Sequence, residues 1–378
     1  MDLSRREFVH AAAASGAALF LASASSTLGA AASASSRHAA TQPGTGDDGA
    51  QTDAATLRRP AGDFSFVHLT DMHVTPKRKG DIGYAACIEH VRGLATRDAA
   101  GERPAFALMG GDLAFDGNYT PKRDFEEQIR LYQEASRKLG IPYYNCMGNH
   151  DALGFGSRRK VPADDPDIGK KLIMDRLEWE KSYYSFGHGG WHFAVLDSIF
   201  PIKTANGPSY EPRIGAEQLE WLAYDLGAAG ERPKICVTHI AAFCAIGQIN
   251  GDREAKALGH MTISDSKALR EILERHDVKA LLQGHSHRIE EYRFNGVWYL
   301  TSPAVSGAWW AGDWVGSPPG YTVFRCHGDE LTWRHEFFGW QERLEPEDEL
   351  ERGKIAAHAR FIAEQRELRT RERAARRG

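Results

Sequence analysis

Five short clusters of carboxylate, imidazole and amide side chains occur along the sequence, each directly after an apolar run. The clusters are "TDMH", "GGD", "GNHD", "VTH" and "GHSH", and their candidate metal ligands are Asp71, His73, Asp112, Asn149, His239, His285 and His287. Oxygen and imidazole donors without a thiolate suit iron, manganese or zinc. One ion ordinarily takes fewer donors, so the set predicts two ions that share a carboxylate. Such a pair, roughly 3.5–4 Å apart, clamps both the attacking and the leaving oxygen of a phosphoryl displacement.

Each cluster alone has an ordinary structural explanation. Asp71 could cap a turn, Asp112 could belong to an Asx-turn, and His239 could be a hydrogen-bonded core histidine. The glycines Gly110, Gly111 and Gly148 could be loop hinges. Because all of these explanations would have to hold together at five places in the chain, the combined pattern favours one functional site.

The apolar runs before the clusters are expected to be strands of a layered α/β fold. Strands are predicted over 64–70, 105–111, 142–148, 234–240 and 278–284. Helical spacing alternates with them over 82–95, 124–140, 216–226 and 264–276. Hairpins over 183–198 and 291–301 add antiparallel strands, which predicts a mixed sheet or two sheets between helices. The clusters then follow the carboxyl ends of strands, where open α/β sheets gather their binding groups.

The ordered set "DMH", "GGD", "GNHD", "TH" and "GHSH" resembles the calcineurin-like metallophosphoesterase superfamily over Asp71 to His287. The resemblance implies an α/β fold, a four-layer α/β/β/α sandwich of two mixed β-sheets flanked by helices. It implies two divalent or trivalent ions of iron, manganese or zinc. One ion would be held by Asp71, His73, Asp112 and His287, and the other by Asp112, Asn149, His239 and His285.

The resemblance also implies the reaction and its catalytic residues. A hydroxide that bridges the metals would attack phosphorus directly, without a phospho-enzyme. His150 is not a ligand in this family; it approaches the phosphate and the leaving oxygen as proton donor or charge stabiliser. Asp151 would orient the His150 imidazole, and Asn149 would keep an N–H for the substrate. The expected substrate is a small phosphoester.

Two features of the sequence differ from particular branches of this superfamily. Purple acid phosphatases carry a tyrosine where this chain has Phe115, and they lack the first-cluster histidine that is His73 here. Too few residues follow His287 for the large C-terminal domain of exported 5'-nucleotidases. The chain is most similar to the bacterial cyclic-nucleotide phosphodiesterase type, a branch that also includes general phosphodiesterases and phosphatases.

The stretch "SPAVSGAWWAGDWVGSPPGY" could form a loop beside the last cluster. Trp309 and Trp310 are candidate substrate-binding residues that could stack on a base or a lipid tail. A hydrophobic plug at the edge of the sandwich explains the tryptophans equally well. Asn118 or Lys122 could extend the rim of the site, although an ordinary polar loop is favoured there.

The termini have their own composition. Residues 1–34, with Arg5 and Arg6 ahead of an Ala- and Leu-rich run, predict a twin-arginine export signal. Residues 35–60 predict a flexible linker, 61–341 the catalytic domain, and 342–378 a charged helical tail. The apolar run is shorter than the roughly 18 residues of a membrane span. We therefore expect the twin-arginine machinery as a partner and a periplasmic or extracellular location; the oligomeric state is left open.

Composition limits the alternatives. A net charge of -4 over 378 residues gives no general attraction for polyanions, so no nucleic-acid partner is expected and a nuclease is disfavoured. The five widely spaced cysteines, without a CxxC, favour buried thiols over a disulfide framework. A non-catalytic phospholigand- or metal-binding protein on the same fold is the other alternative. The set of ligands is complete, which favours the enzyme.

Overall fold

The computed structural model describes residues 62–97, 103–249, 259–314 and 316–343, together with Glu345 and Asp348. The predicted export signal, the linker and nearly all of the predicted helical tail lie outside these residues, and the domain boundaries stay predictions. No helix in the described part of the chain is both long enough and apolar enough to cross a membrane.

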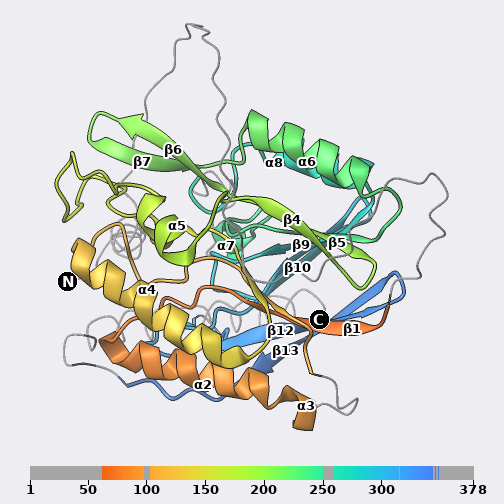
Figure 1. Ribbon diagram of the computed structural model, residues 1–378, viewed down its shortest axis with the longest axis horizontal. Helices are drawn as coiled ribbons and strands as arrows, with labels where there is room; N and C mark the ends of the chain where they lie inside the picture. Colours follow the sequence, from red (N-terminus) through yellow and green to blue (C-terminus); the bar gives the residue numbers. More distant parts are fainter. Residues whose placement is uncertain are drawn as a thin grey trace, which may run out of the picture. The chain divides into compact units, whose positions relative to one another are not determined.

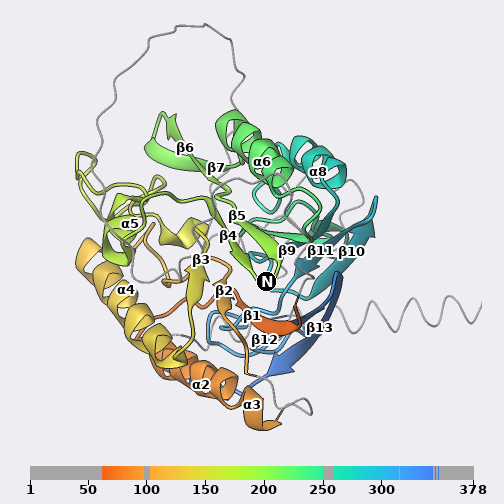
Figure 2. The ribbon, with the colours of Figure 1, turned by 45° about the vertical axis from the view of Figure 1, so that its right-hand side comes forward.

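The first sheet has five strands in the order β13-β12-β1-β2-β3 (Figures 1 and 2). The parallel strands are β1 (Phe64–Leu69), β2 (Ala107–Met109) and β3 (Tyr143–Asn145). The antiparallel strands are β12 (Gly320–His327) and β13 (Glu330–Phe337), and β12 pairs with β1. The three parallel strands end at one edge of this sheet, and "TDMH", "GGD" and "GNHD" follow those ends.

The second sheet has six strands in the order β10-β11-β9-β8-β5-β4. Its parallel strands are β5 (Trp191–Val195), β8 (Lys234–Val237), β9 (Val278–Gln283) and β11 (Val297–Thr301). The edge strands β4 (Tyr184–His188) and β10 (Glu290–Phe294) are antiparallel. A separate hairpin joins β6 (Ile199–Thr204) to β7 (Gly207–Pro212).

Helices cover the outer face of each sheet, as Figures 1 and 2 show. The helices α2 (Gly80–Arg92) and α4 (Lys122–Ser136) pack on the first sheet, and α6 (Ala216–Ala228) and α8 (Ser266–Arg275) pack on the second. The shorter helical segments are α3 (Leu94–Arg97), α5 (Lys171–Leu177), α7 (Ile246–Ile249), η1 (Lys77–Lys79), η2 (Arg137–Leu139) and η3 (Asn149–Asp151).

The strand β1 explains how the layers are held together. Its side chains alternate between two cores, because successive strand residues point to opposite faces. Phe64 and Phe66 pack between the two sheets, whereas Val67 and Leu69 pack against the helices. The ring of Phe66 lies 5.0 Å from Phe324 of the same sheet and 5.5 Å from Phe193 of the other. The predicted four-layer α/β/β/α architecture is therefore confirmed.

Candidate metal centre

Five strand ends bring the predicted ligands together. The loops after β1, β2 and β3 come from the first sheet, and those after β8 and β9 come from the second. Two groups of side chains have ligand atoms within 4.8 Å of one another. One group is Asp71, His73 and His287, and the other is Asp112, His239 and His285. All are buried except His285, which is half-buried.

Asp112 lies between the two groups. Its Oδ2 atom is 3.4 Å from His73 Nε2 and 3.1 Å from His239 Nε2. Asn149, which follows β3, places its Oδ1 atom 3.1 Å from the same His239 nitrogen. The structure thus brings all seven predicted ligands into one cluster, with the carboxylate of Asp112 shared between its halves.

Hydrogen bonds to backbone carbonyls define which ring nitrogens face inward. Nδ1 of His73 donates to Phe115 O at 3.2 Å, Nδ1 of His239 to Gly110 O at 2.9 Å, and Nδ1 of His287 to Gly307 O. A carbonyl only accepts, so each Nδ1 carries a hydrogen, and each ring in its neutral form then presents the lone pair of Nε2. His285 is reversed: its Nε2 donates to His260 O, which leaves Nδ1 for the cluster. Such outer hydrogen bonds are typical of metal-ligating histidines.

One short contact tests whether these residues fit a metal ion. His73 Nε2 and His287 Nε2 lie 3.1 Å apart, although both rings donate from Nδ1 to carbonyls. In their neutral forms the two rings direct lone pairs at each other in a buried place, an arrangement that repels unless a cation lies beside both. Buried carboxylates of Asp71 and Asp112 surround the same space. The donor set fits a metal ion.

The ligands are held by strained backbone. Twelve described non-glycine residues have positive φ, and five of them are predicted ligands: Asp71, His73, Asp112, His285 and His287. Each such conformation costs about 1–3 kcal/mol and persists where the surrounding structure enforces it. Gly148 shows how tight the surroundings are, because a Cβ there would lie 2.0 Å from Asp112 N. That glycine is a close-packing requirement rather than a loose hinge.

The electrostatics of the cluster favour added positive charge. Burial would raise the pKa of Asp112, but the imidazoles of His239 and His150 outweigh it and hold the pKa well below its ordinary value. Burial lowers the pKa of His239, yet the carboxylates of Asp112 and Asp71 raise it to about 9. Burial lowers the pKa of His73 and of His285 to about 3, so both rings are neutral, as metal ligands must be.

His150 lies beside this cluster with a carboxylate partner that the sequence analysis did not identify. Its backbone N–H donates to Asp112 Oδ1 at 2.8 Å, and its Nδ1 lies 3.5 Å from Asp116 Oδ1. Burial lowers the pKa of His150, but the charges of Asp112 and Asp116 raise it to about 9. The ring can therefore carry a proton at neutral pH.

The predicted role of Asp151 is wrong. Its carboxylate accepts N–H groups from Leu113 at 2.9 Å, Ala114 at 3.0 Å and Gly148 at 2.9 Å. These bonds tie the carboxylate to the backbone of the two ligand loops, and no contact between it and the His150 ring is found among the described residues. Asp151 therefore holds the "GGD" and "GNHD" loops together, and Asp116 is the carboxylate that faces His150.

The two candidate tryptophans have different surroundings. The half-buried ring of Trp309 lies 4.2 Å from the His287 ring and 5.7 Å from the His73 ring. Trp310 is fully buried, and its Nε1 donates to His73 O at 2.9 Å. The prediction that Trp310 contacts substrate is therefore wrong, because its indole is packed against α2 at Gly83.

The side chains of the polar loop after Asp112 make structural contacts rather than extending the rim of the metal centre. The buried Asn118 donates from Nδ2 to Asn149 O at 2.8 Å and so supports that ligand's turn. Lys122 pairs with Asp165 at 3.0 Å and Asp167 at 2.7 Å. The contacts of Asn118 and Lys122 therefore agree with the expectation of an ordinary polar loop.

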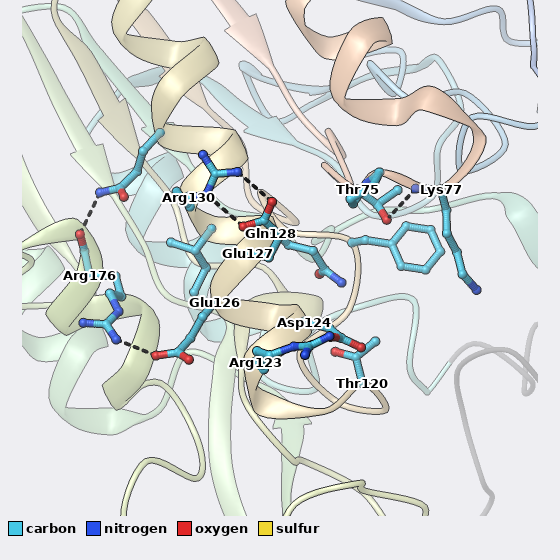
Figure 3. A pocket seen from close by; sticks show the side chains of 14 residues that line it. Thr75, Lys77, Thr120, Arg123, Asp124, Glu126, Glu127, Gln128, Arg130 and Arg176 are labelled. Atoms are coloured by element: carbon cyan, nitrogen blue, oxygen red, sulfur yellow. Dashed lines mark hydrogen bonds and ion pairs between the residues drawn. The ribbon is translucent and has the colours of Figure 1, made fainter.

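A groove of about 880 Å³ lies beside the centre, along α4 (Figure 3). Thr75 and Phe115, which follow the ligands His73 and Asp112, are among its lining residues, and Thr75 lies at one end of it. Its charged side chains are largely paired with one another, as Arg130 with Glu127 and Arg176 with Glu126. None of the seven predicted ligands lines the groove, so the chemistry belongs to the cluster at the strand ends.

Comparisons with known proteins agree with this geometry. Residues 64–288 match the family model described as calcineurin-like phosphoesterase. A probable cyclic nucleotide phosphodiesterase from Xenorhabdus bovienii is 22% identical over 252 residues, covering 66% of this chain and 89% of that protein. A probable glycerophosphodiester phosphodiesterase from Arcobacter nitrofigilis is 23% identical over 255 residues, covering 64% of this chain and 78% of that protein.

A solved dimetal phosphatase from Danio rerio has the same fold, with a TM-score of 0.52 at 12% identity, covering 74% of this chain and 97% of that chain. The family model covers more than half of the present sequence and includes every strand end that carries a predicted ligand. The chain belongs to the calcineurin-like phosphoesterase family, and it is a phosphoester hydrolase with a candidate metal centre at the strand ends.

Proposed function

We propose that this protein hydrolyses small phosphodiesters with two metal ions held at the strand-end cluster. The observation that carries the proposal is the position of Asp112, whose Oδ2 atom lies 3.4 Å and 3.1 Å from imidazoles of the two ligand groups. The names of the two bacterial relatives, both phosphodiesterases, support a diester substrate.

The metal ions and the residues around the cluster would each have a separate role in the reaction. Two bound ions would supply an activated water and neutralise the charge on the phosphoryl group. The amide of Asn149 would offer its oxygen to an ion and an N–H to the substrate. His150, protonated beside Asp112 and Asp116, would donate its proton to the leaving oxygen. The half-buried Trp309 ring offers a surface on which part of the substrate can stack.

The test combines metal analysis with turnover. Purified protein reconstituted separately with iron, manganese or zinc should bind two ions per chain and hydrolyse bis(4-nitrophenyl) phosphate. A screen of cyclic nucleotides, glycerophosphodiesters, nucleoside monophosphates and sugar phosphates then identifies the preferred ester. Two bound ions with no hydrolysis of any ester would identify a phospholigand-binding protein instead, and one ion per chain would exclude the shared-carboxylate mechanism.

Export completes the proposal. The twin-arginine pattern at Arg5 and Arg6 supports residues 1–34 as a signal and 35–60 as a linker, ahead of a catalytic domain at 61–341 and a charged tail at 342–378. The enzyme would then act in the periplasm or outside the cell. Replacing Arg5 and Arg6 by Lys should retain the unprocessed protein in the cytoplasm, as cell fractionation would measure. Unchanged processing of that variant would exclude the twin-arginine route.

A further inference from the structure

Arg78 joins three parts of the chain that are distant in sequence. The residue as a whole is 9% exposed, its Nη1 donates to Trp309 O at 2.8 Å, and its Nη2 donates to Asp348 Oδ1 at 2.6 Å. Its backbone N–H donates to Glu345 Oε1 at 3.1 Å, and the Glu345 N–H donates to Asp348 Oδ2 at 2.9 Å. Glu345 and Asp348 thus contact Arg78 together, from the C-terminal side of the catalytic domain.

The other end of this connection is the metal centre. The Trp309 ring lies against the rings of His287 and His73, which are both ligands of the same predicted ion. Trp309 and Trp310 have positive φ angles of 50° and 70°, conformations that persist only where contacts enforce them. The Arg78 bond to Trp309 O is one such contact, and the Trp310 bond to His73 O is another.

A buried ion pair makes this contact sensitive to loss of either partner. The side chains of Arg78 and Asp348 are each 10% exposed. Removing one charge leaves the other buried without compensation, which is more disruptive than replacing both by apolar groups. A lysine cannot substitute for Arg78, because a single ammonium cannot reproduce the planar fork that reaches Trp309 O and Asp348 from two nitrogens.

We propose that Arg78 is a positioning residue that couples Glu345 and Asp348 to the metal subsite of Asp71, His73 and His287 through Trp309. The inference rests on the proposed two-metal function. Breaking the ion pair frees the Trp309 carbonyl, the ring withdraws from His287 and His73, and that subsite binds its ion less tightly. The subsite of Asn149, His239 and His285 does not contact Trp309 among the described residues and keeps its affinity.

Titration of the metal-free protein with Mn²⁺, followed by calorimetry, tests the coupling. In Arg78→Lys and Asp348→Asn the affinity of one site should fall roughly threefold to tenfold, below the 10–100-fold effect of a direct partner of a ligand. The other site should match the parent. His287→Asn identifies the affected site, and Arg92→Met, which alters an exposed pair with Glu89 on α2, should behave as the parent. Equal changes at both sites, or none, would overturn the proposal.

Two further measurements separate coupling from misfolding and from failure of the two-metal mechanism. The double variant Arg78→Met with Asp348→Leu replaces the buried pair by apolar groups and should unfold at parent-like urea concentrations, yet show the same weakened site. Near-UV circular dichroism of the metal-free protein reports the Trp309 ring directly. Arg78→Lys should lose the signal that Trp309→Phe loses. Retention of that signal refutes the positioning role even if the parent binds no metal.

Discussion

Replacing Asp112 by Asn is expected to lower kcat by roughly a thousandfold or more, because two ions supply several kcal/mol of transition-state stabilisation and each 1.36 kcal/mol is a factor of ten. The Oδ2 atom of Asp112 faces one imidazole of each ligand group. An amide in its place retains one neutral oxygen and loses the negative charge that would hold two cations close together. At least one ion per chain should be lost.

Asparagine is the informative replacement because it preserves the rest of the site. The φ angle of Asp112 is 52°, a left-handed conformation that Asn adopts more readily than Ala. An Asn carbonyl in the Oδ1 position can still accept the His150 N–H that Asp112 accepts at 2.8 Å. Metal content and turnover of bis(4-nitrophenyl) phosphate are the measurements, with the half-exposed Asp124→Asn on α4 as control. Two ions and parent-like turnover in the variant would rule out a shared carboxylate.

The elements that position the site were largely predictable. Their strands are short apolar runs that stop where a polar cluster begins, and the helix expected over 216–226 is observed as Ala216–Ala228. The hairpin β6–β7 was missed despite its Asn206-Gly207 turn signal. Pro201 and Pro208 lie within its strands, and proline is atypical of a strand except at the edge of a sheet. Both strands of this two-stranded sheet are edge strands, so the prolines are tolerated here.

The seven ligands could be predicted as residue types, but the directions of neighbouring side chains could not. Asp151 follows His150 in the sequence, yet the η3 turn directs its carboxylate to Leu113 N and Ala114 N. Trp309 and Trp310 are adjacent, but their left-handed backbone sends one ring to the ligands and the other under α2.

The role of Asp116 beside His150 could not be predicted, because it depends on how two loops meet in the folded protein. Its Oδ1 accepts the N–H of Asn118 at 2.9 Å, an ordinary Asx-turn that "DGN" would suggest. The same oxygen lies 3.5 Å from His150 Nδ1, and that proximity depends on the loop after β2 meeting the loop after β3. No spacing within either loop predicts that contact.

Replacing His150 by Ala is expected to leave both ions bound and to slow hydrolysis in proportion to the basicity of the leaving group. A general acid contributes about 10²–10⁴-fold, so kcat for an alkyl leaving group should fall roughly 100-fold or more. A nitrophenolate departs without a proton, so its rate should fall much less. The ligand cluster should persist because the contact from position 150 to Asp112 uses the backbone N–H, which Ala retains.

Asp116→Asn tests the same step from the partner's side. An Asn carbonyl can still accept the Asn118 and Tyr119 N–H groups, while the charge that helps to keep His150 protonated is lost. The rate loss should rank the leaving groups as His150→Ala does but be smaller, since the His150 imidazole itself remains in place. His327→Ala, exposed at the far end of β12 from the centre, is the control. Equal losses of kcat for alkyl and nitrophenyl esters in His150→Ala would contradict proton donation and leave only charge stabilisation for the imidazole.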